Sequence, residues 1–312
     1  MEKNMANMAF SGIATFGKTP YVNRPTREQA DIAVLGVPYD AAIGYRPGTR
    51  FGPRAIRNSS TRYAFGEAGS GVGGYWDVNL KKRMLEGWRV VDAGDVDVLY
   101  LDMDYTYRQI TGRVEQLLGE GIFPVVLGGD HSVSFPVLRA FAGRGPLNIV
   151  HIDAHLDFKD EVMGVRFGNS SPIRRMSELE FVKEIFSFGV RGIRTSEKDY
   201  GEALERGNIV VTAREFKKLG PEEVLSMLPG QQQYYVTIDI DALDPALAPG
   251  TGSPEAGGLD YECLLDFLRG LVRKGRVLGF DLVEVNPYFD PAEVTSLVAA
   301  RLVLEFLGAI FE

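Results

Sequence analysis

Acidic and imidazole side chains gather at the ends of two strongly apolar runs of this chain. Asp153, His155 and Asp157 follow the run 147–152, and Asp239 and Asp241 end the run 234–240. Residues two apart on an extended segment share one face, because side chains alternate along a strand. Carboxylates on a buried face repel one another and lose their hydration unless a cation neutralises them. The spacing therefore predicts divalent metal binding at these strand ends.

A third strand end adds another imidazole. The run 123–127 is followed by two glycines, which permit a sharp turn, and by His131 at the start of a helical segment. The candidate ligands are His131, Asp153, His155, Asp157, Asp239 and Asp241. Six groups exceed the needs of one ion and suit a two-metal site, with ions about 3.5–4 Å apart. Oxygen and imidazole donors without thiolate suit Mn(II), and also Ni(II), Fe(II), Co(II) or Zn(II). We expect His151 to face the opposite way and to pack in the core.

Short apolar runs that alternate with amphipathic segments must position these groups. The runs lie at 31–37, 89–92, 123–127, 148–152, 185–190, 208–211, 234–240 and 277–283. They are rich in Val and Ile, as expected for strands covered on both faces. Helical periodicity marks the segments 105–118, 132–141, 261–272 and 294–311.

This alternation predicts the α/β class. We expect a single three-layer α/β/α domain with a mostly parallel sheet of about eight strands, preceded by an N-terminal arm. The arm would span residues 1–28 and the domain residues 29–312. In such sheets the functional groups lie at the carboxyl ends of the strands, which is where the candidate ligands fall.

The composition of the chain excludes several classes of protein. The 312 residues contain three His and one Cys, so an internal disulfide framework and a thiolate zinc cluster are excluded. The net charge of −8 opposes nucleic-acid binding, which needs a basic surface. No apolar run approaches the roughly 20 residues of a membrane span, and the first 19 residues lack a signal-peptide pattern. We therefore expect a cytoplasmic protein.

Three motifs at the strand ends resemble the signature blocks of the ureohydrolase superfamily, which includes arginases and agmatinases. They are Gly-Gly-Asp-His-Ser at 128–132, Asp-Ala-His-Leu-Asp at 153–157 and Asp-Ile-Asp-Ala-Leu-Asp-Pro at 239–245. Further resemblances lie at 46–53, 248–258 and 280–287, in the family's order. The likeness spans roughly residues 30 to 310 and is closest to agmatinase-like members.

The resemblance implies a role for each site residue. The six candidate ligands would bind two Mn(II), with Asp153 and Asp239 bridging them. A hydroxide held there would attack a guanidinium carbon, and Asp157 would pass its proton to the leaving amine. Glu284 matches the residue that pairs with the substrate guanidinium. The family commonly forms trimers or hexamers, so a homotrimer or homohexamer is expected.

One position departs from the family pattern. Asn169 stands where the family usually has a His that helps to move protons, and an amide cannot carry a proton near neutral pH. Either protons travel through Asp157 and water, or the substrate differs from the usual one. A third alternative is a metal-binding, inactive subunit of an active enzyme.

The resemblance favours agmatine, cleaved to urea and putrescine, as the substrate. Guanidinobutyrate, guanidinopropionate, a formimino compound and small guanidines are alternatives, and a one-zinc amide hydrolase is a more distant one. A carboxylated substrate would need a cationic partner such as Arg166, Arg174 or Arg175. An amine tail would instead favour Asp160 or Glu161.

Overall fold

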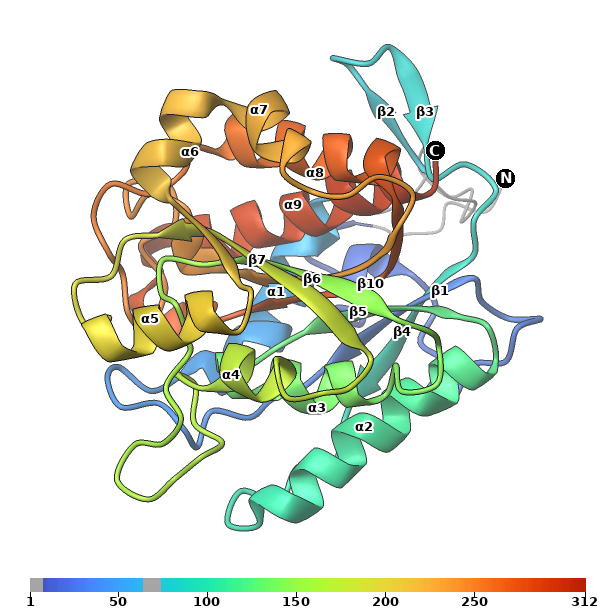
Figure 1. Ribbon diagram of the computed structural model, residues 1–312. Coiled ribbons are helices and arrows are strands. Elements are labelled where there is room, and N and C mark those ends of the chain that lie inside the picture. Colours follow the sequence, from blue (N-terminus) through green and yellow to red (C-terminus); the bar gives the residue numbers. More distant parts are fainter. Residues whose placement is uncertain (1–7, 64–73) are drawn as a thin grey trace, which may run out of the picture.

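An eight-stranded parallel sheet forms the centre of the computed structural model, which describes residues 8–63 and 74–312 (Figure 1). Its strands are β1 (Ile32–Gly36), β4 (Val90–Asp95), β5 (Phe123–Leu127), β6 (Leu147–Ile152), β7 (Val182–Val190), β8 (Ile209–Thr212), β9 (Gln233–Asp239) and β10 (Arg276–Val283). Each corresponds to one of the runs predicted as strands. The prediction of an α/β fold with about eight mostly parallel strands is confirmed.

The strand order is β4-β1-β5-β10-β9-β6-β7-β8. The last strand of the chain, β10, lies between β5 and β9, with Leu282 opposite Leu127 on one side and opposite Ile238 on the other. Consequently β5, β10, β9 and β6 are consecutive neighbours in the middle of the sheet. These are the strands that carry the candidate site residues at their carboxyl ends.

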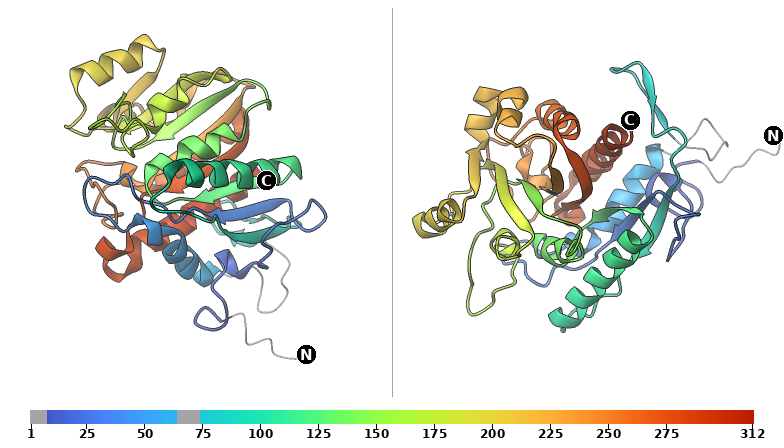
Figure 2. Two further views of the ribbon diagram at one scale, coloured as in Figure 1. Left: turned by 90° about the horizontal axis from the view of Figure 1, so that it is seen from below. Right: turned by 45° about the vertical axis from the view of Figure 1, so that its right-hand side comes forward.

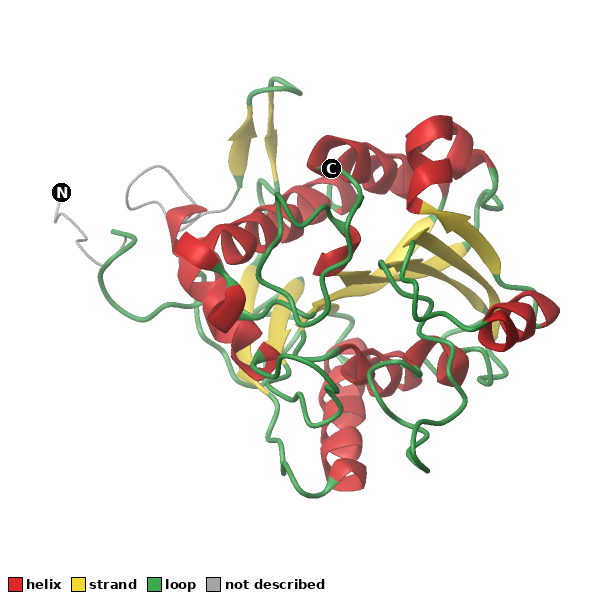
Figure 3. Ribbon diagram, turned by 90° about the vertical axis from the view of Figure 1, so that its left-hand side faces the viewer, coloured by secondary structure: helices red, strands yellow, loops and turns green. Residues whose placement is uncertain are grey.

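Helices cover both faces of the sheet (Figures 1 and 3). They are α1 (Gly52–Ser60), α2 (Met103–Gly119), α3 (Ser134–Arg139), α4 (Pro172–Met176), α5 (Glu197–Glu205), α6 (Ala213–Leu219), α7 (Pro221–Ser226), α8 (Tyr261–Lys274) and α9 (Val294–Ile310). Two separate cores result. Ile32 and Val34 of β1 pack on the side of α1 and α6 to α9, whereas Ala33 and Leu35 pack on the side of α2 to α5. Burial on both faces explains why the strands are continuously apolar.

The four predicted helices are present with small shifts at their ends. Side-chain caps fix two of the starts, because the Asp102 carboxylate accepts from the Tyr105 amide before α2 and that of Asp260 accepts from the Cys263 amide before α8. The predicted helix at 132–141 is interrupted: a 3-10 turn at His131–Val133 precedes α3.

Two features were not predicted. A hairpin of β2 (Tyr75–Asp77) and β3 (Lys82–Met84) projects from the body beside the C-terminus (Figures 1 and 2). In addition, part of the expected arm packs onto the sheet. Phe16 is fully buried, and its amide donates to Asp92 at 2.8 Å. None of the described helices combines the length and apolar character needed to traverse a bilayer.

Candidate metal centre

The candidate residues meet at the carboxyl edge of the four central strands. The turn between β5 and His131 passes close to the loop of Tyr39. A Cβ on Gly129 would lie 1.8 Å from the carbonyl oxygen of Tyr39, so only glycine fits at this position. The carboxylate of Asp130 then accepts from the amide of Ser132 and caps the turn that presents His131. Asp157 and Glu284 adopt left-handed backbone conformations, with φ of 49° and 67°. Such strain in non-glycine residues is concentrated at functional sites.

The ring of His131 points one nitrogen at three carboxylates. Its Nδ1 lies 2.9 Å from Asp153 Oδ2, 3.1 Å from Asp157 Oδ2 and 3.5 Å from Asp239 Oδ2. This nitrogen is buried, yet it has no partner with hydrogen-bond geometry. A lone pair and three carboxylate oxygens around one point form a donor set that fits a cation.

A second set of donors surrounds His155. Its Nδ1 lies 3.1 Å from Asp241 Oδ2 and 3.3 Å from Asp153 Oδ1. Asp153 therefore turns one oxygen toward each imidazole. This arrangement is the one that a carboxylate shared by two ions requires.

The electrostatics of the cluster also favour cations. Burial and the neighbouring carboxylates of Asp241 and Asp153 raise the pKa of Asp239 well above its usual value. Burial tends to lower the pKa of His131, but the three carboxylates around it raise that pKa well above the ordinary value. The cluster thus holds more negative charge than its own residues neutralise, and divalent ions would compensate for it.

His151 does not face away from the site, so that expectation is wrong. It lies two residues before Asp153 and therefore on the same face of the strand. Its ring is fully buried, and its Nε2 donates to Asp153 Oδ2 at 2.9 Å while its Nδ1 lies 3.0 Å from the hydroxyl of Ser187. His131, His151 and Asp153 form one potential metal-binding group, and Asp153, His155 and Asp241 form another. Because both its nitrogens are engaged, His151 orients the carboxylate of Asp153.

A chain of buried hydrogen bonds fixes the ring of His131 from behind. Its Nε2 lies 2.9 Å from the hydroxyl of Thr237, and that hydroxyl donates to Asp281 Oδ1 at 2.6 Å. Asp281 also accepts from the hydroxyls of Ser134 and Tyr235. Because Thr237 gives its only proton to Asp281, it must accept from Nε2–H of His131. With Nε2–H held in this bond, Nδ1 is the nitrogen that can give up its proton and donate its lone pair to a metal.

Glu284 borders the cluster from β10. Its Oε1 accepts from the amide of His131 at 2.9 Å, and its side chain is 5% exposed. A Cβ on Gly252 would lie 3.1 Å from Glu284 Oε2, so the absence of that carbon leaves space beside the carboxylate. Burial and the charge of Asp130 raise the pKa of Glu284, which therefore favours a cationic partner.

A cavity of about 760 Å³ opens over this cluster. Its lining includes His155, Asp157, Asp239, Asp241, Glu284 and Asn169. Asn169 therefore lies at the cavity, as its place in the sequence pattern predicts.

The charged residues expected to recognise the tail of a substrate lie elsewhere. Arg166, Arg174, Arg175, Asp160 and Glu161 are all absent from the described lining of the cavity. Most of them bind one another or α5. Asp160 accepts from Arg175 and Arg166, and Arg174 binds Glu202. This part of the sequence-based prediction is wrong, because these side chains stabilise the loop after β6.

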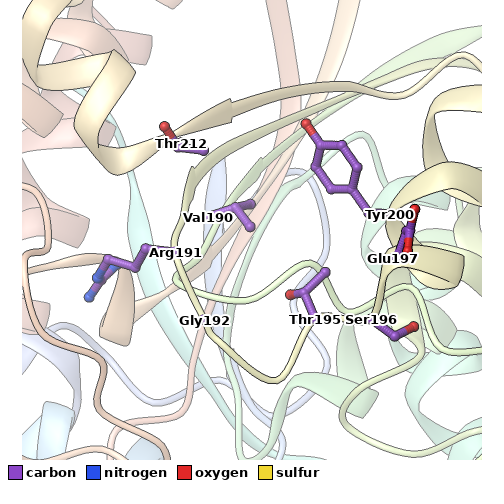
Figure 4. Close-up of a pocket in the computed structure, with 8 residues that line it drawn as sticks. All are labelled: Val190, Arg191, Gly192, Thr195, Ser196, Glu197, Tyr200 and Thr212. Atoms are coloured by element: carbon purple, nitrogen blue, oxygen red, sulfur yellow. The ribbon is translucent and has the colours of Figure 1, made fainter.

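Arg191 is a site-supporting residue that the sequence did not reveal. Its guanidinium donates to backbone carbonyls on both sides of the cluster, including those of Asp241 at 2.7 Å and Glu255 at 2.7 Å. In Figure 4 its side chain points away from Tyr200, and the two residues border a separate hollow of about 340 Å³. Arg191 thus holds the loop of Asp241 against the loop of Glu255, whose Oε1 lies 3.7 Å from His155 Nε2. No periodicity or motif marks an arginine that binds carbonyls.

The parallel sheet and the buried carboxylate–imidazole cluster at its edge define an α/β protein with a site suited to divalent metals. The sequence matches the arginase family over residues 30–308, and the chain belongs to that family.

Individual relatives cover nearly the whole chain. An agmatinase of Bacillus anthracis is 36% identical over 93% of this chain and 96% of its own length. A guanidinobutyrase of Pseudomonas aeruginosa is 36% identical over 96% of this chain and 92% of its own. Among solved structures, the proclavaminate amidino hydrolase of Streptomyces clavuligerus superimposes with a TM-score of 0.86 and 33% identity. That match covers 97% of this chain and 98% of the other.

Proposed function

We propose that this chain is a metal-dependent hydrolase of C–N bonds in linear amidines, which cleaves a guanidino compound to urea and an amine. The observation that carries the proposal is the unpartnered Nδ1 of His131, which faces three carboxylates beneath a cavity that Glu284 also lines. The relatives named agmatinase and guanidinobutyrase support the reaction class. We place the protein in the cytoplasm, as a homotrimer or homohexamer.

The metal ligands in this proposal are the six residues of the sequence prediction, with two Mn(II) as the first choice and Ni(II) as the second. His131 Nδ1 and His155 Nδ1 supply the nitrogen donors, and Asp153 faces both of them. When bound, such ions make a water molecule acidic enough to act as a nucleophile at neutral pH.

The chain's own residues supply orientation and proton transfer. Glu284 holds the guanidinium by parallel N–H bonds to its two oxygens, and its burial strengthens this contact. Asp157, whose pKa burial and the charge of Asp153 raise, accepts the proton of the attacking water. It then delivers that proton to the leaving amine. Asn169 contributes hydrogen bonds at the cavity but no proton transfer.

Two substrates remain candidates for the rest of the molecule. Agmatine follows from the resemblance of the sequence blocks to those of agmatinases. A guanidino acid such as guanidinobutyrate is favoured by the arginines that line the cavity.

A urea assay tests the proposal. The purified protein is loaded with Mn(II) or Ni(II), bound metal is measured, and urea release is followed across a panel of guanidino compounds. Urea together with two ions per chain supports the proposal. Two bound ions without urea from any compound would contradict it and favour the inactive-subunit reading.

A further inference from the structure

Five charged side chains line the cavity in addition to those of the metal cluster and Glu284. They are Arg46, Lys159, Arg194, Asp199 and Glu255. A substrate whose guanidinium binds Glu284 must place its other end among these groups. Their pairing therefore decides which charge that end carries.

One of the two carboxylates in this set is already paired. Asp199 accepts from Nζ of Lys159 at 3.0 Å, and its pKa is lowered because the hydroxyl of Ser196 and this lysine outweigh the effect of burial. Glu255 Oε1 lies 3.7 Å from Nε2 of His155, beside the metal cluster. Asp199 is therefore not free to bind the ammonium group of an amine substrate.

The two arginines in this set have no anionic partner among the residues that the structure describes. The guanidinium of Arg46 lies 5.0 Å from the ring centre of Tyr45 and 4.8 Å from that of Phe289. Within residues 8–63 and 74–312, neither Arg46 nor Arg194 forms a side-chain ion pair or hydrogen bond. Arg194 is exposed and belongs to the segment between β7 and α5, two residues beyond Gly192, where a Cβ would contact the ring of His155.

The backbones of these two arginines lie beside different parts of the site. The carbonyl of Arg46 lies near Gly252, which also borders Glu284, whereas Arg194 follows Gly192, which borders the ring of His155. We therefore expect a chain bound at Glu284 to meet Arg194 with its far end.

The charges of these five side chains point the same way. Lys159 matches Asp199. Arg46, Arg194 and Glu255 remain, with one excess positive charge. A carboxylate tail neutralises this excess, whereas an ammonium tail adds to it.

From this balance, and resting on the proposed function, we infer that the substrate is a guanidino acid whose carboxylate binds Arg194. The planar guanidinium of Arg194 offers two parallel N–H groups to the carboxylate. Arg46 contributes positive potential to the cavity. The preferred substrate is thus anionic at the end remote from the reacting carbon.

A matched pair of substrates tests this inference. 4-Guanidinobutyrate and agmatine carry the same guanidinium on chains of similar length, and they differ in the charge of the tail. We expect the metal-loaded protein to have the higher kcat/KM for the acid. Arg194→Ala should lower kcat/KM for the acid about tenfold or more without lowering that for agmatine, and Arg194→Glu should invert the preference. Lys198→Ala is the matched control, because it removes one exposed positive charge nearby that does not line the cavity.

Calorimetric binding separates this inference from the proposed reaction. Tighter binding of the acid than of agmatine, lost in Arg194→Ala, supports the carboxylate site even if no urea forms. The carboxylate site is overturned if the protein prefers agmatine in both rate and binding and if Arg194→Ala leaves the ratio of agmatine to acid unchanged. The proposed hydrolysis would still stand in that case.

Discussion

Removal of the Thr237 hydroxyl should weaken metal binding although Thr237 is not a proposed ligand. Thr237 is fully buried between His131 and Asp281, and Thr237→Val replaces it with a side chain of nearly the same shape. The variant leaves Nε2–H of His131 without an acceptor and removes one of three donors from the Asp281 carboxylate.

The magnitude follows from these two losses. One unsatisfied buried group costs about 1–3 kcal/mol, so the free energy of unfolding should fall by up to that amount. The ring can recover a hydrogen bond by moving its proton to Nδ1, where three carboxylate oxygens lie within 3.5 Å. That tautomer has no lone pair on Nδ1. Metal affinity should therefore fall about 10- to 100-fold, as expected when a group that orients a ligand is lost.

Two measurements check this prediction. Competition with a chelator reports metal affinity, and chemical denaturation reports the free energy of unfolding. Thr237→Ser is the control, since it keeps the hydroxyl and should keep the affinity. A Val variant with the metal affinity of the wild type would refute the reasoning.

Four further predictions concern the site and the fold. Asp239→Asn should abolish metal retention and activity. It should also raise the unfolding temperature of the metal-free protein, because repulsion with the neighbouring carboxylates ends. Unchanged metal content would contradict the ligand assignment. Asn169→His should raise turnover if proton transfer limits the rate, and an unchanged rate would show that protons travel by another route. Arg191→Met should lower the free energy of unfolding by more than about 3 kcal/mol in chemical denaturation, since several carbonyls lose a charged donor; a loss within about 0.5 kcal/mol would show that other contacts hold these loops. Hydrogen bonds from Arg89 lower the pKa of Asp31 below its ordinary 3.8, so Asp31 stabilises the fold above about pH 4 and loses this contribution as the pH falls further. Asp31→Asn should flatten the acid limb of the stability profile, and an acid limb as steep as that of the wild type would contradict this assignment.

The strands could be predicted from the sequence because burial on both faces leaves a continuous apolar run, and eight such runs became the eight strands of the sheet. The order of the strands could not be predicted. Nothing in residues 276–283 indicates that they insert between β5 and β9, since that choice depends on the packing of both sheet faces. The short hairpin was missed because its three-residue strands carry no long apolar pattern.

The cluster itself could be predicted because residues two apart at the end of a strand point to the same face of the sheet. The same rule, applied consistently, would have placed His151 beside Asp153. Groups that support the site were harder to find. Arg191 binds carbonyls, which every residue has, and Arg194 is distinguished by forming no ion pair with the described part of the chain. Such roles depend on the neighbours that folding brings together, and these lie far apart in the sequence.

The central position of β10 has a consequence for the order of events during synthesis. His131 and Glu284 are 153 residues apart, and the strand that precedes Glu284 is the last to leave the ribosome. Until residues 276–283 emerge, β1, β4 and β5 can form one part of the sheet and β6 to β9 another, each with an open edge that β10 later joins. The cluster that would bind metal is completed only by this final insertion. Metal uptake would therefore report that the whole chain has been made and folded, and a chain truncated before residue 276 would bind neither the ions nor the guanidinium.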